Sequence, residues 1–409
     1  MKPTFLSLYS FLLLIITLTG QSYGEEPSRA NLHYKNLKFI LDAMYSQGFT
    51  DNVALSPTSD EWGARSKLKG MMGLLLPIKK SETGLRVFGN LALHGDQNYD
   101  VKSFSVLLAE KLELGQYLHL LSDGSITRSS SFNPISDEVP VDILSGKVRG
   151  IAAITTKKRL SFVSIYSFTR EHDYNGYYYD DYRENSSLNT IWFSFTPKTA
   201  LLVNYNFSKG QYFSDTLTDD NDTYTHFART GLRFARIARR LDGQFELGIR
   251  HSESTLFPDI YEDAPVFFDV EGTINSNFTK VKLGLTIDYG IRPTFGTNRI
   301  YAYKDTAVDP TQSLVYELNP FVTILGSQLT GSWNVVSKFF ITASVAGESR
   351  KYPVGERDDI FIRQRYSLEW SLKKYFRFIL YYINTNNDSN VDRYTYKVNE
   401  PGITISAKF

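Results

Sequence analysis

The 409-residue chain contains no cysteine, which excludes a disulfide framework, thiolate metal ligands and a lipid anchor on an N-terminal cysteine. After Gly24 it also lacks any apolar run of the roughly 20 residues that a membrane-spanning helix needs. An excess of one charge sign is missing too, since the net charge of +1 gives no field that would attract nucleic acid.

Motifs of catalysis and of cofactor binding are equally scarce. The six histidines are scattered, and none stands in a metal-ligand spacing such as His-Glu-x-x-His. There is no Gly-x-Ser-x-Gly nucleophile turn and no glycine loop of the kind that binds phosphate. We therefore expect no cofactor, no metal site, no catalytic residues and no nucleic-acid partner, so the protein is not expected to be an enzyme.

The N-terminus has the features of a cleavable secretory leader. Met1-Lys2 provides a charged start, Phe5–Thr19 is almost wholly apolar, and Ser22-Tyr23-Gly24 places small residues where a signal peptidase reads them. The expected organisation is a signal peptide, a short periplasmic segment and one large domain, at residues 1–24, 25–36 and 37–409.

Aromatic residues are abundant, and they occur in runs with a period of two. The chain has 28 Phe and 27 Tyr, although its mean hydropathy is only −0.27. A period of two indicates strands with one apolar and one polar face. Such runs include Gln244–Arg250, Leu201–Phe207, Phe339–Val345 and Val281–Tyr289.

The connections between these runs alternate between two kinds. Short, basic turns are expected at Leu76–Thr83, Thr155–Arg159, Thr196–Thr199, Ile237–Gly243, Ser337–Lys338 and Leu372–Phe376. Longer loops rich in Asp, Asn, Tyr, Ser and Gly are expected at Phe49–Glu61, Ser129–Pro140, His172–Asn185, Phe213–Thr223, Ser252–Ala264, Arg292–Gln312, Arg350–Asp359 and Asn384–Asp392. Turns on one side and loops on the other are typical of barrels in the Gram-negative outer membrane.

The pattern predicts an all-β protein, a transmembrane antiparallel up-and-down β-barrel of about 18 strands. Val266–Leu318 leaves room for one hairpin more or fewer, so 16 strands is the alternative count. An even number places both termini in the periplasm. A barrel of this size leaves an aqueous lumen, whereas an eight-stranded barrel is filled by its own side chains.

The C-terminus carries a second signal. Gly402–Phe409 alternates apolar with polar residues and stops on an aromatic residue, and we expect Phe409 to serve as the signal for the outer-membrane barrel assembly machinery. Tyr394, Tyr396 and Val398 lie on the opposite parity from Ile403 and Ile405. Either a bulge at Glu400–Gly402 or a strand that begins only after Pro401 would explain the change.

Strand parity predicts which side chains line the lumen. Residues of both charge signs, with one tryptophan, fall on the polar face of their strands, namely Arg229, Arg233, Glu246, Arg250, Lys282, Asp288, Arg363, Arg365, Glu369 and Trp192. A mixed wall suits a neutral or weakly charged hydrophilic solute, sugars among them. The alternative is that these charges pair across strands and only make the wall rigid.

Two predicted loops could carry chemistry of their own. Asp173–Asp181 and Asp215–Asp222 offer closely spaced carboxylates for Ca²⁺, but the glycine and closing Glu of an EF-type loop are missing, so hydrated loops are the simpler interpretation. His172 and Asp173 suggest an outer-membrane hydrolase only weakly. Divalent ions that bridge these carboxylates to lipopolysaccharide phosphates are a weaker, generic alternative. Outer-membrane lipid and lipopolysaccharide are the expected partners of such a barrel.

Several segments resemble a β-barrel porin family found beside exopolysaccharide genes. They are Tyr45–Val53 with Ser56-Pro57-Thr58, the turn Phe195–Thr199 with the strand Leu201–Phe207, the Asp-rich late loops and the terminal Phe409. The resemblance spans nearly all of the mature chain and implies an outer-membrane pore associated with export of an extracellular polysaccharide, which makes polysaccharide a candidate partner. It brings no catalytic residues. Arg292–Gln312 and the parity change at Pro401 are where the chain departs from such relatives.

Together these observations predict a passive conduit for a hydrophilic solute, with exopolysaccharide as the expected cargo. The alternative from a different class is a surface adhesin or structural protein, in which the barrel is an anchor and the Tyr- and Asp-rich loops are the functional part. An outer-membrane hydrolase at His172 and Asp173 is the third hypothesis.

Overall fold

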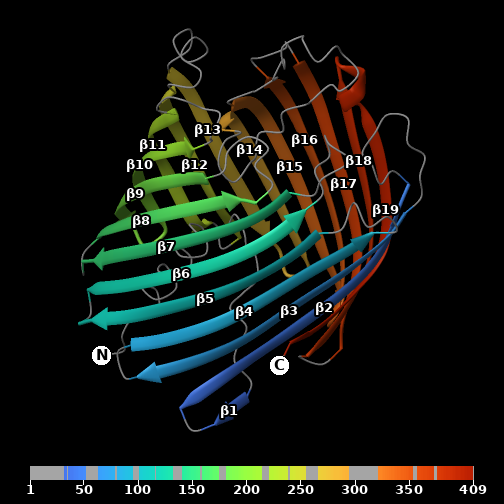
Figure 1. The fold of residues 1–409 in the computed structure, drawn as a ribbon, viewed down its shortest axis with the longest axis horizontal. Helices are drawn as coiled ribbons and strands as arrows, with labels where there is room; N and C mark the ends of the chain where they lie inside the picture. Colours follow the sequence, from blue (N-terminus) through green and yellow to red (C-terminus); the bar gives the residue numbers. More distant parts are fainter. Residues whose placement is uncertain are drawn as a thin grey trace.

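The computed structural model describes residues 32–34, 36–51, 63–78, 81–94, 101–115, 117–131, 141–156, 159–174, 181–213, 221–237, 240–254, 266–293, 321–352, 357–372 and 375–408. Within them, eighteen long strands form one closed antiparallel barrel, to which a short first strand is added (Figure 1). The all-β barrel of about 18 strands predicted from the sequence is thereby confirmed.

The strands follow one another along the chain in the order in which they pair. They are β1 (Leu32–Tyr34), β2 (Leu37–Thr50), β3 (Gly63–Ile78), β4 (Ser81–His94), β5 (Val101–Leu114), β6 (Leu118–Ser131), β7 (Val141–Thr155), β8 (Leu160–Asp173), β9 (Asp181–Thr196), β10 (Thr199–Phe213), β11 (Asn221–Ile237), β12 (Leu241–Ser254), β13 (Val266–Asn277), β14 (Val281–Pro293), β15 (Phe321–Val336), β16 (Phe339–Tyr352), β17 (Arg357–Leu372), β18 (Phe376–Ser389) and β19 (Tyr396–Lys408). One 3-10 turn, Asp392–Tyr394, precedes β19.

Exposed apolar side chains alternate with polar ones along the strands, which gives the sheet two different faces. In β14, Leu283, Leu285 and Ile287 are exposed, and Lys282 and Asp288 occupy alternate positions. A closed barrel shields its inner face, so the set of exposed apolar side chains lies on the outer face. Residues directly opposite each other on neighbouring strands share a face, and the register therefore extends this assignment around the barrel.

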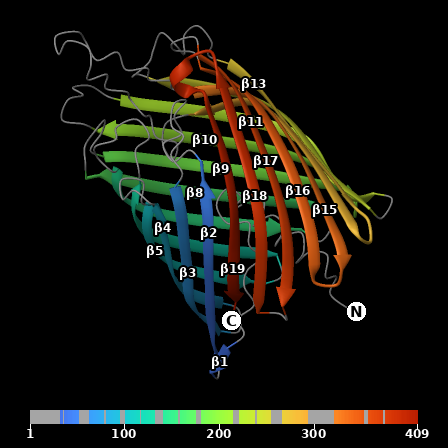
Figure 2. The ribbon, with the colours of Figure 1, turned by 90° about the vertical axis from the view of Figure 1, so that its right-hand side faces the viewer.

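The barrel closes where β19 returns to β2, and Figure 2 shows these two strands side by side. Their ladder runs from the Gly402–Gly48 pair to the Lys408–Asp42 pair. The hydroxyls of Ser46 and Thr404 are 2.7 Å apart and buried at this seam. Closure removes both free edges of the sheet, which would otherwise be open to pairing with other chains.

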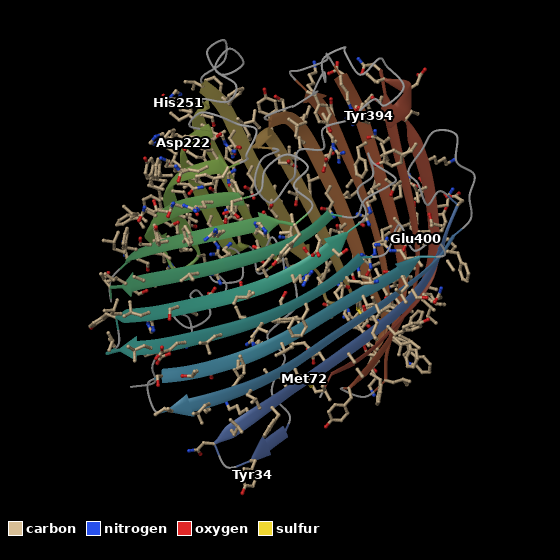
Figure 3. All side chains as sticks on the ribbon, viewed as in Figure 1. Tyr34, Met72, Asp222, His251, Tyr394 and Glu400 are labelled. Carbon is tan, nitrogen blue, oxygen red and sulfur yellow. The ribbon has the colours of Figure 1, made fainter. Side chains whose placement is uncertain are left out.

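The two kinds of connection alternate around the barrel, as predicted. Short turns occupy residues 79–80, 115–117, 156–159, 197–198, 238–240, 278–280, 337–338 and 373–375, and the other connections occupy 51–62, 95–100, 132–140, 174–180, 214–220, 255–265, 294–320, 353–356 and 390–395. The sequence pattern missed 95–100, 115–117 and 278–280. Tyr34 of β1 lies at the end with the short turns, whereas Asp222, His251 and Tyr394 lie at the other end, called here the loop end (Figure 3).

The described part of the stretch Val266–Leu318, residues 266–293, forms one hairpin of β13 and β14, so the barrel has 18 long strands and the alternative count of 16 is wrong. The two strands are joined at residues 278–280. The connection 294–320, which includes most of the large loop expected at Arg292–Gln312, lies outside the described residues.

Both explanations offered for the parity change near Pro401 are wrong. β19 begins at Tyr396 and pairs with β18 without a register shift, so there is neither a bulge nor a late start. Tyr396 and Val398 share the inner face with buried Thr404, which means that the apolar residues change face and the backbone does not. Pro401 stands just before the ladder to β2 begins, where a missing N–H donor interrupts little.

Some expectations fall on residues that the structure does not describe. The predicted leader, 1–24, and the aromatic terminus, Phe409, are among them. The expected periplasmic segment, 25–36, includes β1, which pairs with the first residues of β2. Among the described residues, no helix is long and apolar enough to cross a membrane.

Candidate functional site

Two of the predicted lumen residues, Arg229 of β11 and Arg250 of β12, meet on the inner face of the barrel. Arg229 donates through Nη2 to Asp269 Oδ1 and through Nη1 to Glu271 Oε2, at 2.7 Å in each case. Arg250 Nη2 lies 4.0 Å from Asp269 Oδ2. Asp269 and Glu271, both on β13, were not predicted, although their alternation with Phe268 and Val270 carries the same period-two signal.

A glycine makes this cross-strand contact reachable. Arg229 and Asp269 both stand opposite Gly248 of the intervening strand β12. A Cβ at Gly248 would lie 2.6 Å from Arg229 Cγ, so only glycine lets the arginine pass over β12. Phe227 supports the arrangement, because the guanidinium carbons of Arg229 and Arg250 lie 4.3 and 4.4 Å from its ring centre.

Glu246 is nearly inaccessible, with 3% of its surface exposed. Its carboxylate accepts a hydrogen bond of 2.9 Å from Asn204 Nδ2 and another from Gln244 Nε2. Gly231 stands directly opposite and leaves room for it, since a Cβ there would lie 2.7 Å from Glu246 Cγ. Amide donors thus satisfy this buried group, which is consistent with a structural role.

Trp192 and Arg233 come together on a different part of the wall. The guanidinium of Arg233 lies 5.3 Å from the Trp192 ring centre. Four buried apolar residues form a cluster beside it, namely Ile151, Ala153, Val163 and Ile165. The tryptophan packs against this cluster, as do Leu121 and Leu188. Strand parity placed Trp192 on a polar face, but its surroundings there are largely apolar.

A second ion-paired cluster, which the sequence reasoning missed, lies on β16 and β17 near the loop end. Arg350 Nη2 is 2.7 Å from Glu348 Oε2, and Arg357 donates through Nε to Asp359 Oδ1 at 2.9 Å. The Arg357 guanidinium also lies 3.4 Å from the ring centre of Tyr394. The sequence contains a signal for this cluster, because the acid and the arginine of each pair are two residues apart and therefore share one face of a strand.

The remaining predicted residues are placed separately. Glu369 is ion-paired with Arg377, at 2.6 Å from Nε to Oε1. Lys282, Arg363 and Arg365 are exposed on the inner face and form no ion pair with any described residue. Asp288 lies beside Gly326, which stands opposite it on β15.

Pairing separates the two charge signs on the inner face. Most inner carboxylates are ion-paired or buried, as with Asp123 on Arg149, Asp269 on Arg229 and Asp359 on Arg357. Among the described residues of this face, the exposed charged side chains without an ion pair are all cations, namely Lys69, Lys147, Lys282, Arg363 and Arg365. The wall that water reaches is therefore more positive than the sequence composition suggests.

The metal-site, hydrolase and calcium-loop hypotheses concern His172 and the acidic loops. In the part of the chain that is described, no group of three or more His, Asp or Glu residues could hold a metal ion. His172 lies in β8, and its Nδ1 is 3.0 Å from Asp181 Oδ1 of β9, so its ring is held by an acid other than Asp173. Most of the two acidic loops considered for calcium, at 175–180 and 214–220, lies outside the described residues.

No protein-family model and no curated protein matches the chain. Solved structures do resemble it, and the likeness covers more than 90% of both chains in each case. OccAB2 of Acinetobacter baumannii has a TM-score of 0.53 at 10% identity, covering 92% of this chain and 98% of its own. The outer membrane protein OpdK of Pseudomonas aeruginosa has a TM-score of 0.50 at 8% identity, covering 91% and 98%. OccK2 (OpdF) of P. aeruginosa, in complex with glucuronate, has a TM-score of 0.51 at 11% identity, covering 92% and 97%. At such low identity the likeness shows a shared fold, the closed barrel of these bacterial proteins.

Proposed function

We propose that the protein is a passive outer-membrane channel for hydrophilic solutes. One observation carries the proposal: a closed barrel of 18 strands has exposed apolar side chains on its outer face and mainly polar side chains on its inner face. Barrels of 16 to 18 strands leave a water-filled lumen, and an apolar outer band fits hydrocarbon. The likeness to an outer membrane protein, OpdK, supports the same location.

The orientation follows from the two kinds of connection. Short turns typically face the periplasm and longer loops the exterior. The start of β2 and the end of β19 lie at the end with the short turns, so both termini are proposed to be periplasmic. The barrel assembly machinery is the partner proposed for insertion.

The solutes are proposed to be anionic. Lys69, Lys147, Lys282, Arg363 and Arg365 are exposed on the inner face without an ion pair among the described residues, while most carboxylates there are neutralised. Unpaired cations in a water-filled passage raise the local concentration of anions. Seven of the ten predicted lumen residues thus divide into two groups: Arg229, Glu246, Arg250 and Glu369 brace the wall, and Lys282, Arg363 and Arg365 face the solute.

Export of an acidic exopolysaccharide is the narrower form of this proposal. It depends on the sequence resemblance given above, and glucuronate bound to OccK2 shows only that a barrel of this fold can hold a sugar acid. A sugar acid is hydrophilic and anionic, so it fits the exposed cations of the inner face.

Planar-bilayer recordings test the channel. The purified, folded chain should show stable open conductance, and its reversal potential in a KCl gradient should indicate anion preference. Arg363→Gln/Arg365→Gln should shift the reversal potential toward the value for a less anion-selective channel, because two of the exposed inner cations are lost. The matched control is Lys351→Gln/Lys397→Gln, which removes the same charge from exposed positions of the outer face. Absence of conductance, or an equal shift in both variants, would contradict the proposal.

A further inference from the structure

Arginines gather on the outer face of β6, β8 and β9, close to the loop end. Arg170 and Arg183 stand directly opposite each other across the β8–β9 pairing. Arg128 lies one row away, opposite Leu144, which in turn stands opposite His172. Like charges placed directly opposite on neighbouring strands destabilise a sheet unless an anion compensates them. This arginine patch is defined by Arg128, Arg170 and Arg183.

The carboxylates nearby compensate only part of this charge. Asp142 accepts hydrogen bonds from Arg128 Nη2 and Nε at 2.8 and 3.3 Å, and Asp181 accepts one from Arg170 Nη2 at 2.6 Å. Among the described residues, three guanidiniums stand against two carboxylates, which leaves one positive charge in excess. The side chains of Arg128 and Arg170 remain 63% and 55% exposed, so donors not used by the carboxylates point to the surroundings.

Aromatic rings hold the arginines at this surface. The Arg128 guanidinium lies 5.2 Å from the ring centre of Tyr174, and that of Arg183 lies 4.5 Å from the ring centre of Phe213. Tyr174 is itself 52% exposed, and its backbone N–H donates to Asp142 O at 3.0 Å. Tyrosine and arginine together at the loop end of an outer face form an amphipathic boundary between apolar and polar surroundings.

Toward the short-turn end the same face becomes apolar and open. Ile126 and Val148 are 62% and 61% exposed. Gly146 stands between Ile126 and Arg170 in the register, and no atom lies within 4 Å of the place its Cβ would take. A hydrocarbon chain can therefore approach the backbone at Gly146, directly beside the charged patch.

We propose that the arginine patch binds the phosphate of an anionic glycolipid of the outer leaflet, with an acyl chain lying over Gly146 and Val148. This inference depends on the proposed location in the outer membrane. Guanidiniums recognise phosphate through paired N–H donors, and the phosphate supplies the charge that Asp142 and Asp181 do not. Tyr174 adds a hydroxyl at the level of the headgroup.

Native mass spectrometry of the full chain in detergent, with EDTA present to remove bridging cations, tests the site. The probes are lipid A with both phosphates and the same lipid with the phosphates removed. The wild-type protein should bind the phosphorylated form more tightly, by about tenfold or more. Arg170→Gln/Arg183→Gln should abolish this preference, and Lys351→Gln/Lys397→Gln should retain it.

Three results would overturn the proposal. They are equal affinity for the two lipids, equal weakening in the control variant, and full displacement of the lipid by inorganic phosphate, which would indicate a site for free anions. Should the double variant fail to fold, as judged by circular dichroism, Arg128→Gln gives the same readout. Conductance of each variant keeps the two proposals distinguishable, because a patch on the outer face should leave it unchanged.

Discussion

The most demanding prediction concerns Arg229, because its removal should unbalance the inner wall of β11 to β13. In Arg229→Met, Asp269 and Glu271 each lose a charge-assisted hydrogen bond of 2.7 Å. The side chain of Asp269 is only 9% exposed, and its remaining cationic partner among the described residues is the more distant Arg250, at 4.0 Å. Its carboxylate therefore remains shielded and poorly neutralised.

The magnitude follows from the exposure of the two acids. A hydrogen bond to a charged group contributes about 1.5–3 kcal/mol, and loss of one partner of a buried ion pair costs about 3–5 kcal/mol. For Asp269, which is only 9% exposed, we take about 3 kcal/mol, where these two ranges meet. Glu271 is 44% exposed, so solvent replaces most of its bond and its loss costs about 0.5 kcal/mol. We expect the free energy of unfolding to fall by about 3.5 kcal/mol, roughly three-hundredfold in the equilibrium constant.

Reversible urea unfolding in lipid vesicles, followed by tryptophan fluorescence, measures this change. Asp269→Asn in the Arg229→Met background should recover at least about 1 kcal/mol, because the shielded charge is then gone. Arg365→Met is the control, since this exposed arginine has no ion pair among the described residues, and its effect should stay within about 0.5 kcal/mol. A loss below about 1 kcal/mol in Arg229→Met, or no recovery in the double variant, would refute the reasoning.

Two further predictions concern the backbone. In Gly402→Ala the new Cβ would come within 2.7 Å of Gln47 O and closer still to the Tyr381 ring, so the closing seam should loosen. Electrophoresis of samples heated to increasing temperatures should then show that the barrel unfolds at a lower temperature than the wild type. Gly89→Ala, where nothing lies within 4 Å, should leave that temperature unchanged. Lys338, in the turn between β15 and β16, has a φ of 78°, a conformation that glycine adopts more easily than lysine. Lys338→Gly should therefore raise the free energy of unfolding by about 0.5–1 kcal/mol. A lower stability of this variant in urea titrations would contradict the prediction.

The architecture was predictable because it depends on a local rule. In Val281–Tyr289 the period of two separates Leu283 and Leu285 from Lys282, and a strand with that pattern has one face for hydrocarbon and one for water. Eighteen such runs with alternating short and long connections leave few topologies other than a closed meander. The missed turn at 278–280 and the parity change at Tyr396 show the limit, since local pattern does not state which face an apolar residue serves.

The inner wall could be predicted only as a composition. Sequence parity counts Arg229, Glu246 and Arg363 alike, as charges of a mixed wall. Which of them are neutralised depends on the register between strands, since Arg229 reaches Asp269 across Gly248 whereas Arg363 meets no acid among the described residues. Register joins residues about 40 positions apart, and no local signal contains it.

The sequence by itself thus determined that alternate side chains belong to two environments, and with this a closed barrel of about 18 strands. Tertiary structure alone decided which charges are paired, which cations remain open to the lumen, and where Arg170 meets Arg183 on the outer face. The physical reason is that strand formation responds to the period of the chain, whereas charge pairing responds to distances of 3 to 4 Å that exist only once the strands have taken their register.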